Sequence, residues 1–197
     1  PAMSAKIASA ALALFAAIPL AAQSPAYIIT RLGVDTVAIE RYTRTGNKLE
    51  GDLVLRHPRV ATYHYTADLG PRGEILSMTT TVRRASANPG APPVVQRVTR
   101  FSDSVAVIEV QRNGKPDTTV SGRKIYHGGA VPMLGVEPTS YGIYEQLLSS
   151  ARLGNDTVAY ALIAPGAGPT PSIILRRRGA DSVAFNSTFF PGWIEVA

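Results

Sequence analysis

The sequence predicts an all-β domain with one helix, built as a curved antiparallel meander that forms a partly closed barrel or a sandwich. After residue 23, apolar and polar residues alternate with a period of two through most of the chain. Turn-forming residues separate these segments, and a single segment has the apolar spacing of a helix. A parallel sheet is excluded, because most of its strands would need a crossover helix between them.

The composition is that of a globular protein without thiol chemistry. The chain has 197 residues, of which 45% are hydrophobic, and it has no cysteine. A chain of this size can bury roughly 70% of its unfolded surface, so it can form a core without disulfides. The absence of cysteine excludes disulfides, thiolate metal sites, cysteine nucleophiles and lipid attachment at a cysteine.

The first 22 residues have the pattern of a signal peptide. Lys6 is followed by an uncharged, mostly apolar run over residues 7–22, which ends in small residues where a signal peptidase could cut. The run is short for a bilayer span. We therefore expect cleavage after Ala22 and export to the periplasm or the extracellular space. The mature part would be a single β-rich domain over residues 23–197.

The last residues predict that this domain is truncated at its C-terminus. Residues 189–197 read as a turn followed by the opening half of a strand, without a turn or polar tail after it. We therefore expect the coding sequence to continue past Ala197, although a short edge strand could also close the domain.

Segment 48–56 shows the strand pattern most clearly. One face of this segment is expected to be core and the other to be charged. The core side has Leu49, Gly51, Leu53 and Leu55, and the charged side has Lys48, Glu50, Asp52 and Arg56. Hairpin turns are expected at residues 45–47, 70–73 and 113–114, because Gly and Asn tolerate the positive φ that such turns need. In all, about ten to twelve strands in hairpin order are expected.

A tetrapeptide, Asp-[Ser/Thr]-Val-Ala, occurs four times along the chain. Its unequal spacing excludes a solenoid or a propeller. The Asp can accept backbone N–H bonds in a turn, and the β-branched pair can then begin a strand. We interpret it as a repeated turn-to-strand device rather than a site. The copies begin at Asp35, Asp103, Asp156 and Asp181.

One helix is predicted late in the chain. Thr139 or Ser140 can cap its N-terminus, and Ile143 and Leu147 belong to an apolar stripe with helical spacing. Gly154 stands where a left-handed residue would end it. The helix should cover one face or one end of the sheet. Residues 87–93 and 164–171 are expected to be loops, as is the segment from His127 to Pro132.

The charge distribution argues against nucleic acid as a partner. The formal net charge is +6, and it becomes +5 when Lys6 is removed with residues 1–22, which hold no Asp or Glu. The positive charge is mostly arginine and is scattered, with no basic helix or lysine-rich tail. An exported basic protein instead meets anionic lipid headgroups and polysaccharides.

The candidates for catalysis are weak. His57, His64 and His127 lack the spacing of a metal pair, so no metal or other cofactor is expected. Ser140 precedes a helix as a hydrolase nucleophile would, with His64 or His127 as its base, but Pro138 stands where a nucleophile elbow needs Gly. The alternatives to catalysis are structural roles: Ser140 would cap the helix, and His64 would be a half-exposed residue of a strand.

The combination of a signal peptide, long meandering strands with YTRTGNKLEGDLVLR and YHYTADLGPRGE, and one late helix resembles exported bacterial β-rich proteins without an assigned function. In some of those, the similar region is an N-terminal module before another small β domain. The resemblance implies no catalytic residue. A looser, fold-level likeness is to the curved half-barrels of periplasmic lipid carriers.

Three functions follow as hypotheses. The first is a non-enzymatic binding or scaffolding module of the cell envelope, which takes a lipid, a glycan or another apolar or amphipathic ligand on a concave sheet face. Aromatic residues supply apolar area with a polar group, so they are the expected lining. The second is a secreted serine-type hydrolase. The third is a structural accessory domain whose partner is a downstream domain of the same chain. The expected ligand-binding residues are Tyr42, Tyr63, Tyr65 and Trp193.

Overall fold

A computed structural model describes residues 24–56, 60–85, 91–133, 140–153, 157–166, 168–178, 183–187 and 194–196. The predicted signal peptide, His57, Gly154 and Trp193 lie outside the described residues, as does the 189–193 part of the predicted terminal turn and strand. In the described part, no helix has the length and apolar character needed to cross a membrane.

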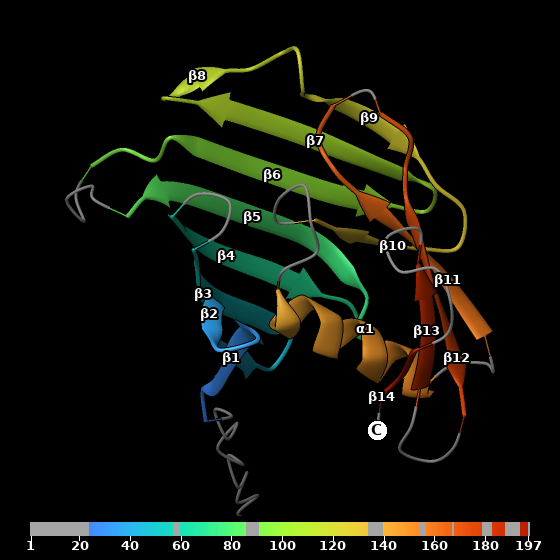
Figure 1. The fold of residues 1–197 in the computed structure, drawn as a ribbon. Coiled ribbons are helices and arrows are strands. Elements are labelled where there is room, and N and C mark those ends of the chain that lie inside the picture. Colours follow the sequence, from blue (N-terminus) through green and yellow to red (C-terminus); the bar gives the residue numbers. More distant parts are fainter. Residues whose placement is uncertain are drawn as a thin grey trace, which may run out of the picture.

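Two β-sheets and one helix make up the described structure (Figure 1). In the first sheet, strands β1 to β8 are neighbours in chain order, and β9 pairs with β7 beside β8. Every pair in this sheet is antiparallel. Its strands are β1 Ala26–Leu32, β2 Asp35–Thr45, β3 Lys48–Leu55, β4 Ala61–Leu69, β5 Ile75–Arg84, β6 Val95–Ser102, β7 Val105–Arg112, β8 Lys115–Pro116 and β9 Gly122–Ile125.

The second sheet is smaller and follows the order β10-β11-β12-β13-β14. The helix α1, Tyr141–Leu153, lies in the chain between β10 and β11. Neither sheet joins its first described strand to its last, so the curved meander stays open. The strands are β10 Gly129–Pro132, β11 Thr157–Ile163, β12 Ser172–Arg177, β13 Val183–Ser187 and β14 Ile194–Val196.

The predicted alternation of faces is confirmed in β3. Leu49, Gly51 and Leu53 are buried, and the residues between them are exposed. Gly46 and Gly114 have φ values of 59° and 75°, as the predicted hairpin turns require. These turns set the register, so one face of the first sheet, here called the inner face, is apolar and the other, the outer face, is largely polar.

The repeated tetrapeptide marks strand starts. Strands β2, β7, β11 and β13 each begin at or just after the Asp of one copy, although Asp156 and Asp181 themselves lie outside the described residues. In three copies the final alanine is buried, at Ala38, Ala106 and Ala184, whereas Ala159 is exposed. In these three copies the tetrapeptide therefore also places a small residue in the core.

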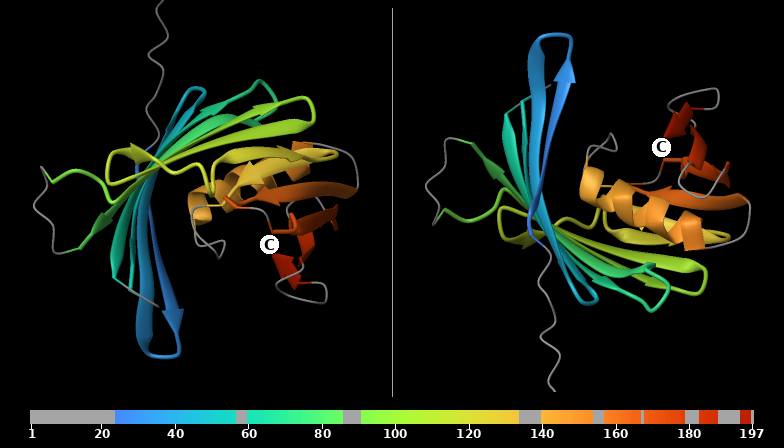
Figure 2. Two further views of the ribbon diagram at one scale, coloured as in Figure 1. Left: turned by 90° about the horizontal axis from the view of Figure 1, so that it is seen from above. Right: turned by 90° about the horizontal axis from the view of Figure 1, so that it is seen from below.

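The main core lies where α1 and the second sheet pack against the inner face of the first sheet. Both views in Figure 2 show α1 beside the curved first sheet, with the second sheet on the same side. Leu53 and Met78 of the first sheet share this core with Leu147 of α1 and Leu175 of β12. The burial of these apolar side chains provides the main stabilisation of the packing.

Two predictions about the middle of the chain are wrong. The segment from His127 to Pro132 is not one long loop, because residues 129–132 form β10. The strands are also not all in hairpin order, because β10 pairs in parallel with β11, with Val131 opposite Leu162. The helix α1 supplies the crossover that a parallel pair requires. Strands of two to four residues, such as β8, β9 and β10, are too short to show a periodic pattern, which also explains why more strands are present than were predicted.

Gly51 provides a test of the inner-face packing. It pairs with Tyr65 in register, and a Cβ at residue 51 would overlap the Tyr65 ring, which is fully buried. We predict that Gly51→Ala lowers the free energy of unfolding by about 1–3 kcal/mol through overpacking, measured by urea denaturation. Gly122→Ala is the matched control, because no heavy atom lies within 4 Å of its added Cβ. Equal stability of the two variants would contradict this packing.

Candidate functional site

Ser140 is a buried helix cap. Its Oγ accepts a hydrogen bond from the Ile143 backbone N–H at 3.3 Å, the bond that an N-cap serine makes in the first turn. The same Oγ donates to Glu40 Oε1 at 2.7 Å. The predicted capping role of Ser140 is thus confirmed, and its hydroxyl proton points to a carboxylate rather than to a histidine.

The structure does not bring His64 to Ser140. His64 lies on the outer face, where its Nδ1 is 2.9 Å from Asp52 Oδ1, whereas Ser140 binds Glu40 on the inner face. His127 is exposed in the connection between β9 and β10. A serine and its base must lie within hydrogen-bond reach. His64 therefore cannot serve as the base of Ser140 in this arrangement.

The surroundings of His64 form a charged ladder across β2, β3 and β4. Arg41 Nη2 donates to Asp52 Oδ2 at 3.0 Å, and His64 Nε2 is 3.8 Å from Glu50 Oε1. Burial alone would raise the pKa of Asp52, but the hydrogen bonds from His64 and Arg41 lower it below its usual value. These exposed pairs are cross-strand contacts of a solvated face, and each adds little stability.

Glu40 is the centre of the buried polar network. Its side chain is 1% exposed, and it comes from β2 to meet the N-terminus of α1. Tyr65 Oη donates to Oε1 at 2.7 Å, and the backbone N–H of Tyr141 donates to Oε2 at 2.6 Å. With the Ser140 hydroxyl and a longer bond from the Gly142 N–H at 3.4 Å, four donors surround this carboxylate. A negative charge is also favourable at the N-terminus of a helix.

Two of the predicted ligand-binding tyrosines, Tyr42 and Tyr65, lie between the first sheet and α1. Tyr65 is fully buried, and Tyr42 Oη donates to Glu145 Oε2 on the helix. A Cβ at Gly142 would overlap the hydroxyl of Tyr65 and crowd the ring of Tyr42, so the glycine lets the helix approach. Tyr63 is half-buried and packs against the same core. Whether these tyrosines contact a ligand stays a prediction.

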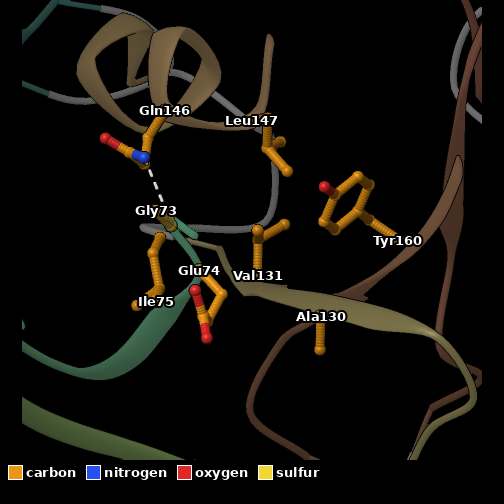
Figure 3. A pocket seen from close by; sticks show the side chains of 8 residues that line it. All are labelled: Gly73, Glu74, Ile75, Ala130, Val131, Gln146, Leu147 and Tyr160. Atoms are coloured by element: carbon orange, nitrogen blue, oxygen red, sulfur yellow. Dashed lines mark hydrogen bonds between the residues drawn. The ribbon is translucent and has the colours of Figure 1, made fainter. Parts of the chain in front are cut away.

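A small cavity of about 10 Å³ lies under the middle of α1 (Figure 3). Gln146 Nε2 donates to the carbonyl oxygen of Gly73 at 2.7 Å and thereby joins the helix to the β4–β5 turn. Figure 3 shows Leu147 on the helix side, Val131 from β10 below, and the Tyr160 ring facing both. This volume is at the lower limit for one water molecule, so the cavity is not a ligand site by itself.

A much larger cleft adjoins this cavity. Its volume is about 620 Å³, and it lies between the β4–β5 and β6–β7 ends of the first sheet and strands β10 and β11. Glu74, Ile75, Ala130 and Tyr160 line both spaces. The cleft is within the range of volumes that protein ligand sites have. The full lining is Arg72, Glu74, Ile75, Leu76, Phe101, Ser102, Asp103, Tyr126, Gly128, Gly129, Ala130, Val158 and Tyr160.

Aromatic rings form a rigid part of the cleft wall. Phe101 and Tyr126 make an edge-to-face contact, with ring centroids 6.1 Å apart. Tyr126 Oη donates to the carbonyl oxygen of Ser102 at 3.1 Å. Burial and, to a smaller extent, the charge of Asp103 raise the pKa of Tyr126. The phenol therefore stays neutral near neutral pH, and its ring contributes apolar area to the cleft.

Charged groups lie at the edge of the cleft. The backbone N–H of Arg72 donates to Glu74 Oε2 at 2.9 Å, and Arg72 Nε is 3.9 Å from Glu74 Oε1. With Asp103, the cleft has two carboxylates and one guanidinium in its lining. An apolar wall with a few charged groups at its margin suits a ligand that has both an apolar and a polar part.

The sequence analysis missed this lining. Phe101 on β6 and Tyr126 after β9 meet within the first sheet, and Tyr160 comes from β11 of the second sheet. No motif in the sequence links them. A sequence signal exists only for the turn at residues 70–73, which was predicted as a hairpin and here forms part of the cleft margin.

The described residues contain no group of three or more His, Cys, Asp or Glu side chains that could hold a metal ion. In comparisons with known proteins, no family model and no curated protein matches the chain. Among solved structures, the chain is similar to the crystal structure of a DUF1089 family protein from Pseudomonas aeruginosa, at 10% identity and a TM-score of 0.48. The match covers 82% of this chain and 84% of that one.

Removing the charge of Glu40 should destabilise the whole inner face. Glu40→Gln keeps the shape, but its amide NH2 would face the donors that now bind Oε1 or Oε2. We predict a loss of about 2 kcal/mol in the free energy of unfolding, measured by urea denaturation. Glu109→Gln is the control, because the exposed Glu109 only pairs with Arg100 across strands, and we expect a change below about 1 kcal/mol. Similar losses in both variants would show that the buried carboxylate is not special.

Alkaline pH should destabilise the protein through three tyrosines of its core, two of them buried and Tyr144 partly buried. Burial is the largest of the causes that raise the pKa values of Tyr42, Tyr65 and Tyr144 above the value of an unfolded tyrosine, which is about 10. Their stabilising effect is fully present below that pH and is lost as pH rises toward the higher folded-state values, because the unfolded chain loses protons first. We predict that Tyr144→Phe makes this loss shallower by up to about 1.4 kcal/mol per pH unit, measured by urea denaturation across a pH series. Tyr27→Phe, at an exposed residue, is the control, and an unchanged slope in Tyr144→Phe would disprove the prediction.

Proposed function

We propose that the protein is a non-enzymatic binding module of the cell envelope that holds an apolar or amphipathic ligand in the cleft between its two sheets. The observation that carries the proposal is the cleft itself, whose volume of about 620 Å³ suits a small molecule. Its wall contains three aromatic side chains from separate elements, Phe101, Tyr126 and Tyr160.

The residues that line the cleft are held in place by other parts of the protein, as expected of a preformed site. Tyr160 is buried and Phe101 is in edge contact with Tyr126, so these rings are held by the core and not by a ligand. The Gln146 bond to Gly73 fixes the turn that carries Arg72 and Glu74. A preformed site loses less conformational entropy on binding than a flexible one.

The place of action rests on the sequence. The predicted signal peptide and the positive net charge favour the cell envelope, where anionic lipids and glycans are abundant. The resemblance to exported β-rich proteins points to the same compartment, and the looser, fold-level likeness to half-barrel lipid carriers points to an apolar or amphipathic ligand. The hydrolase hypothesis receives less support, because Ser140 is buried as a helix cap and His64 lies on the other face of the sheet.

A fluorescence titration with N-phenyl-1-naphthylamine, a neutral apolar probe, tests the cleft. Leu76 lines the cleft and is 45% exposed, so it can be replaced without opening the core. We predict that Leu76→Asp weakens binding of the probe by about tenfold, because a carboxylate would replace apolar contact area. Ile125→Asp is the matched control, since Ile125 is exposed on β9 outside the cleft lining.

The same titration can reject the proposal. If the unchanged protein does not bind the probe, and envelope lipid and glycan extracts do not raise its melting temperature, the ligand hypothesis fails. A role as a structural accessory domain would then be favoured. If Leu76→Asp and Ile125→Asp weaken the probe equally, the probe binds elsewhere and the cleft is not the site.

A further inference from the structure

The end of the first sheet that lies opposite the cleft carries an exposed surface that the proposed function does not use. At this end lie the β1–β2 turn, the ends of β3 and β5, and the start of β4. The cleft lining comes instead from the β4–β5 and β6–β7 turns at the other end. We define the basic end as Arg31, Val34, Arg56, Val60 and Arg84, all of which are exposed.

The β1–β2 hairpin is the most prominent part of this end. In both views of Figure 2 its tip projects beyond the neighbouring strands. Val34 stands at the tip and is 95% exposed, and Val60, before β4, is 53% exposed. Gly33 has a φ of 62° and makes the turn, so Val34 is not needed for the turn geometry. Two exposed valines at strand ends gain nothing from folding.

An apolar row continues from the basic end onto the outer face. Ile29, Ile39 and Val54 are direct cross-strand neighbours on β1, β2 and β3, and all three are exposed. Exposed hydrophobic residues scattered singly need no explanation, but a contiguous group marks a contact surface. The row lies within four residues of the strand ends, so it adjoins the basic end.

The charge around this apolar surface is positive. Arg31, Arg56 and Arg84 are exposed at the strand ends, and Arg83 lies beside them with Nε donating to the carbonyl oxygen of Ala91. Among the described residues of the β1–β2 turn, the ends of β3 and β5 and the start of β4, one side chain is acidic, that of Asp35. Farther along the outer face, the next cross-strand row consists of the exposed Tyr27 and the charged ladder of Arg41, Asp52 and His64, so charged side chains replace the apolar ones on β2 and β3.

We propose that the basic end docks on an anionic lipid surface, with the β1–β2 tip inserted among the headgroups. Apolar side chains at the tip would enter the interface, and the arginines would pair with lipid phosphates while their stems stay in apolar surroundings. The charged ladder limits the depth of insertion, because Asp52 and Glu50 would meet the negative surface. This surface does not depend on the proposed ligand cleft.

Co-sedimentation of the purified chain with lipid vesicles tests the docking. Vesicles of phosphatidylcholine mixed with phosphatidylglycerol should bind the protein, and vesicles of phosphatidylcholine alone should bind it much less. Added salt should weaken binding, since it screens the charges. Arg31→Gln and Arg84→Gln should each weaken binding by about fivefold, and Val34→Asp by about tenfold.

Matched controls come from the opposite end of the sheet. Lys48 and Ile125 are exposed there, so Lys48→Gln and Ile125→Asp make the same chemical changes and should leave vesicle binding unchanged. A Val34→Trp variant adds a second readout, because its fluorescence should shift to the blue on anionic vesicles if the tip enters the interface.

Three results would overturn the docking proposal. Absence of binding to anionic vesicles is the first, and equal losses in the control variants are the second. The third is a dimer in sedimentation velocity that Val34→Asp dissociates, which would make the surface an interface between two copies. The fluorescence titration with N-phenyl-1-naphthylamine and the vesicle experiment use different probes and different variants. Failure of the cleft proposal therefore does not imply failure of the docking proposal, and the reverse also holds.

Discussion

The burial of the Glu40 carboxylate is the constraint on which the arrangement of the two sheets depends. A charge that is 1% exposed is stable only when donors surround it, and here they come from β4, from Ser140 and from the first turn of α1. The helix can therefore begin only where its N–H groups reach β2. Since α1 is the crossover between β10 and β11, Glu40 also sets where the second sheet lies.

The helix in turn connects this polar network to the cleft. Its N-terminus is held by Glu40, and one and a half turns later Gln146 binds the β4–β5 turn. That turn carries Arg72 and Glu74 at the cleft margin. A displacement of the helix would move the turn and Leu147, which faces Tyr160 in Figure 3. The cleft geometry is thus a consequence of how the helix start is fixed.

The sequence was sufficient for local structure and insufficient for contacts between the sheets. Strand β3, the Asn113-Gly114 turn and the Ser140 cap were predictable, because period-two patterns, positive φ and capping act within a few residues. The partners Glu40 and Ser140 lie 100 residues apart, and nothing in either segment indicates the other. The parallel pairing of β10 was hidden by its four-residue length. Tyr42 and Tyr65 were predicted to contact a ligand, and the structure places them under α1. The alternation that predicts an apolar face does not say what covers that face, and contact of these tyrosines with a ligand stays a prediction.

The distance between the two proposed surfaces, the cleft and the basic end, would restrict how they work together. Strand β5 runs from the cleft margin at Ile75 to the basic end at Arg84, and the distance between these two residues is about 30 Å in an extended strand. A protein docked by its β1–β2 tip would therefore hold the cleft about one bilayer core thickness away from the lipid headgroups. Direct exchange of a ligand between that membrane and the cleft would need release and reorientation of the protein. Together, the two proposals describe a module that is held at one surface while its cleft faces away from that surface.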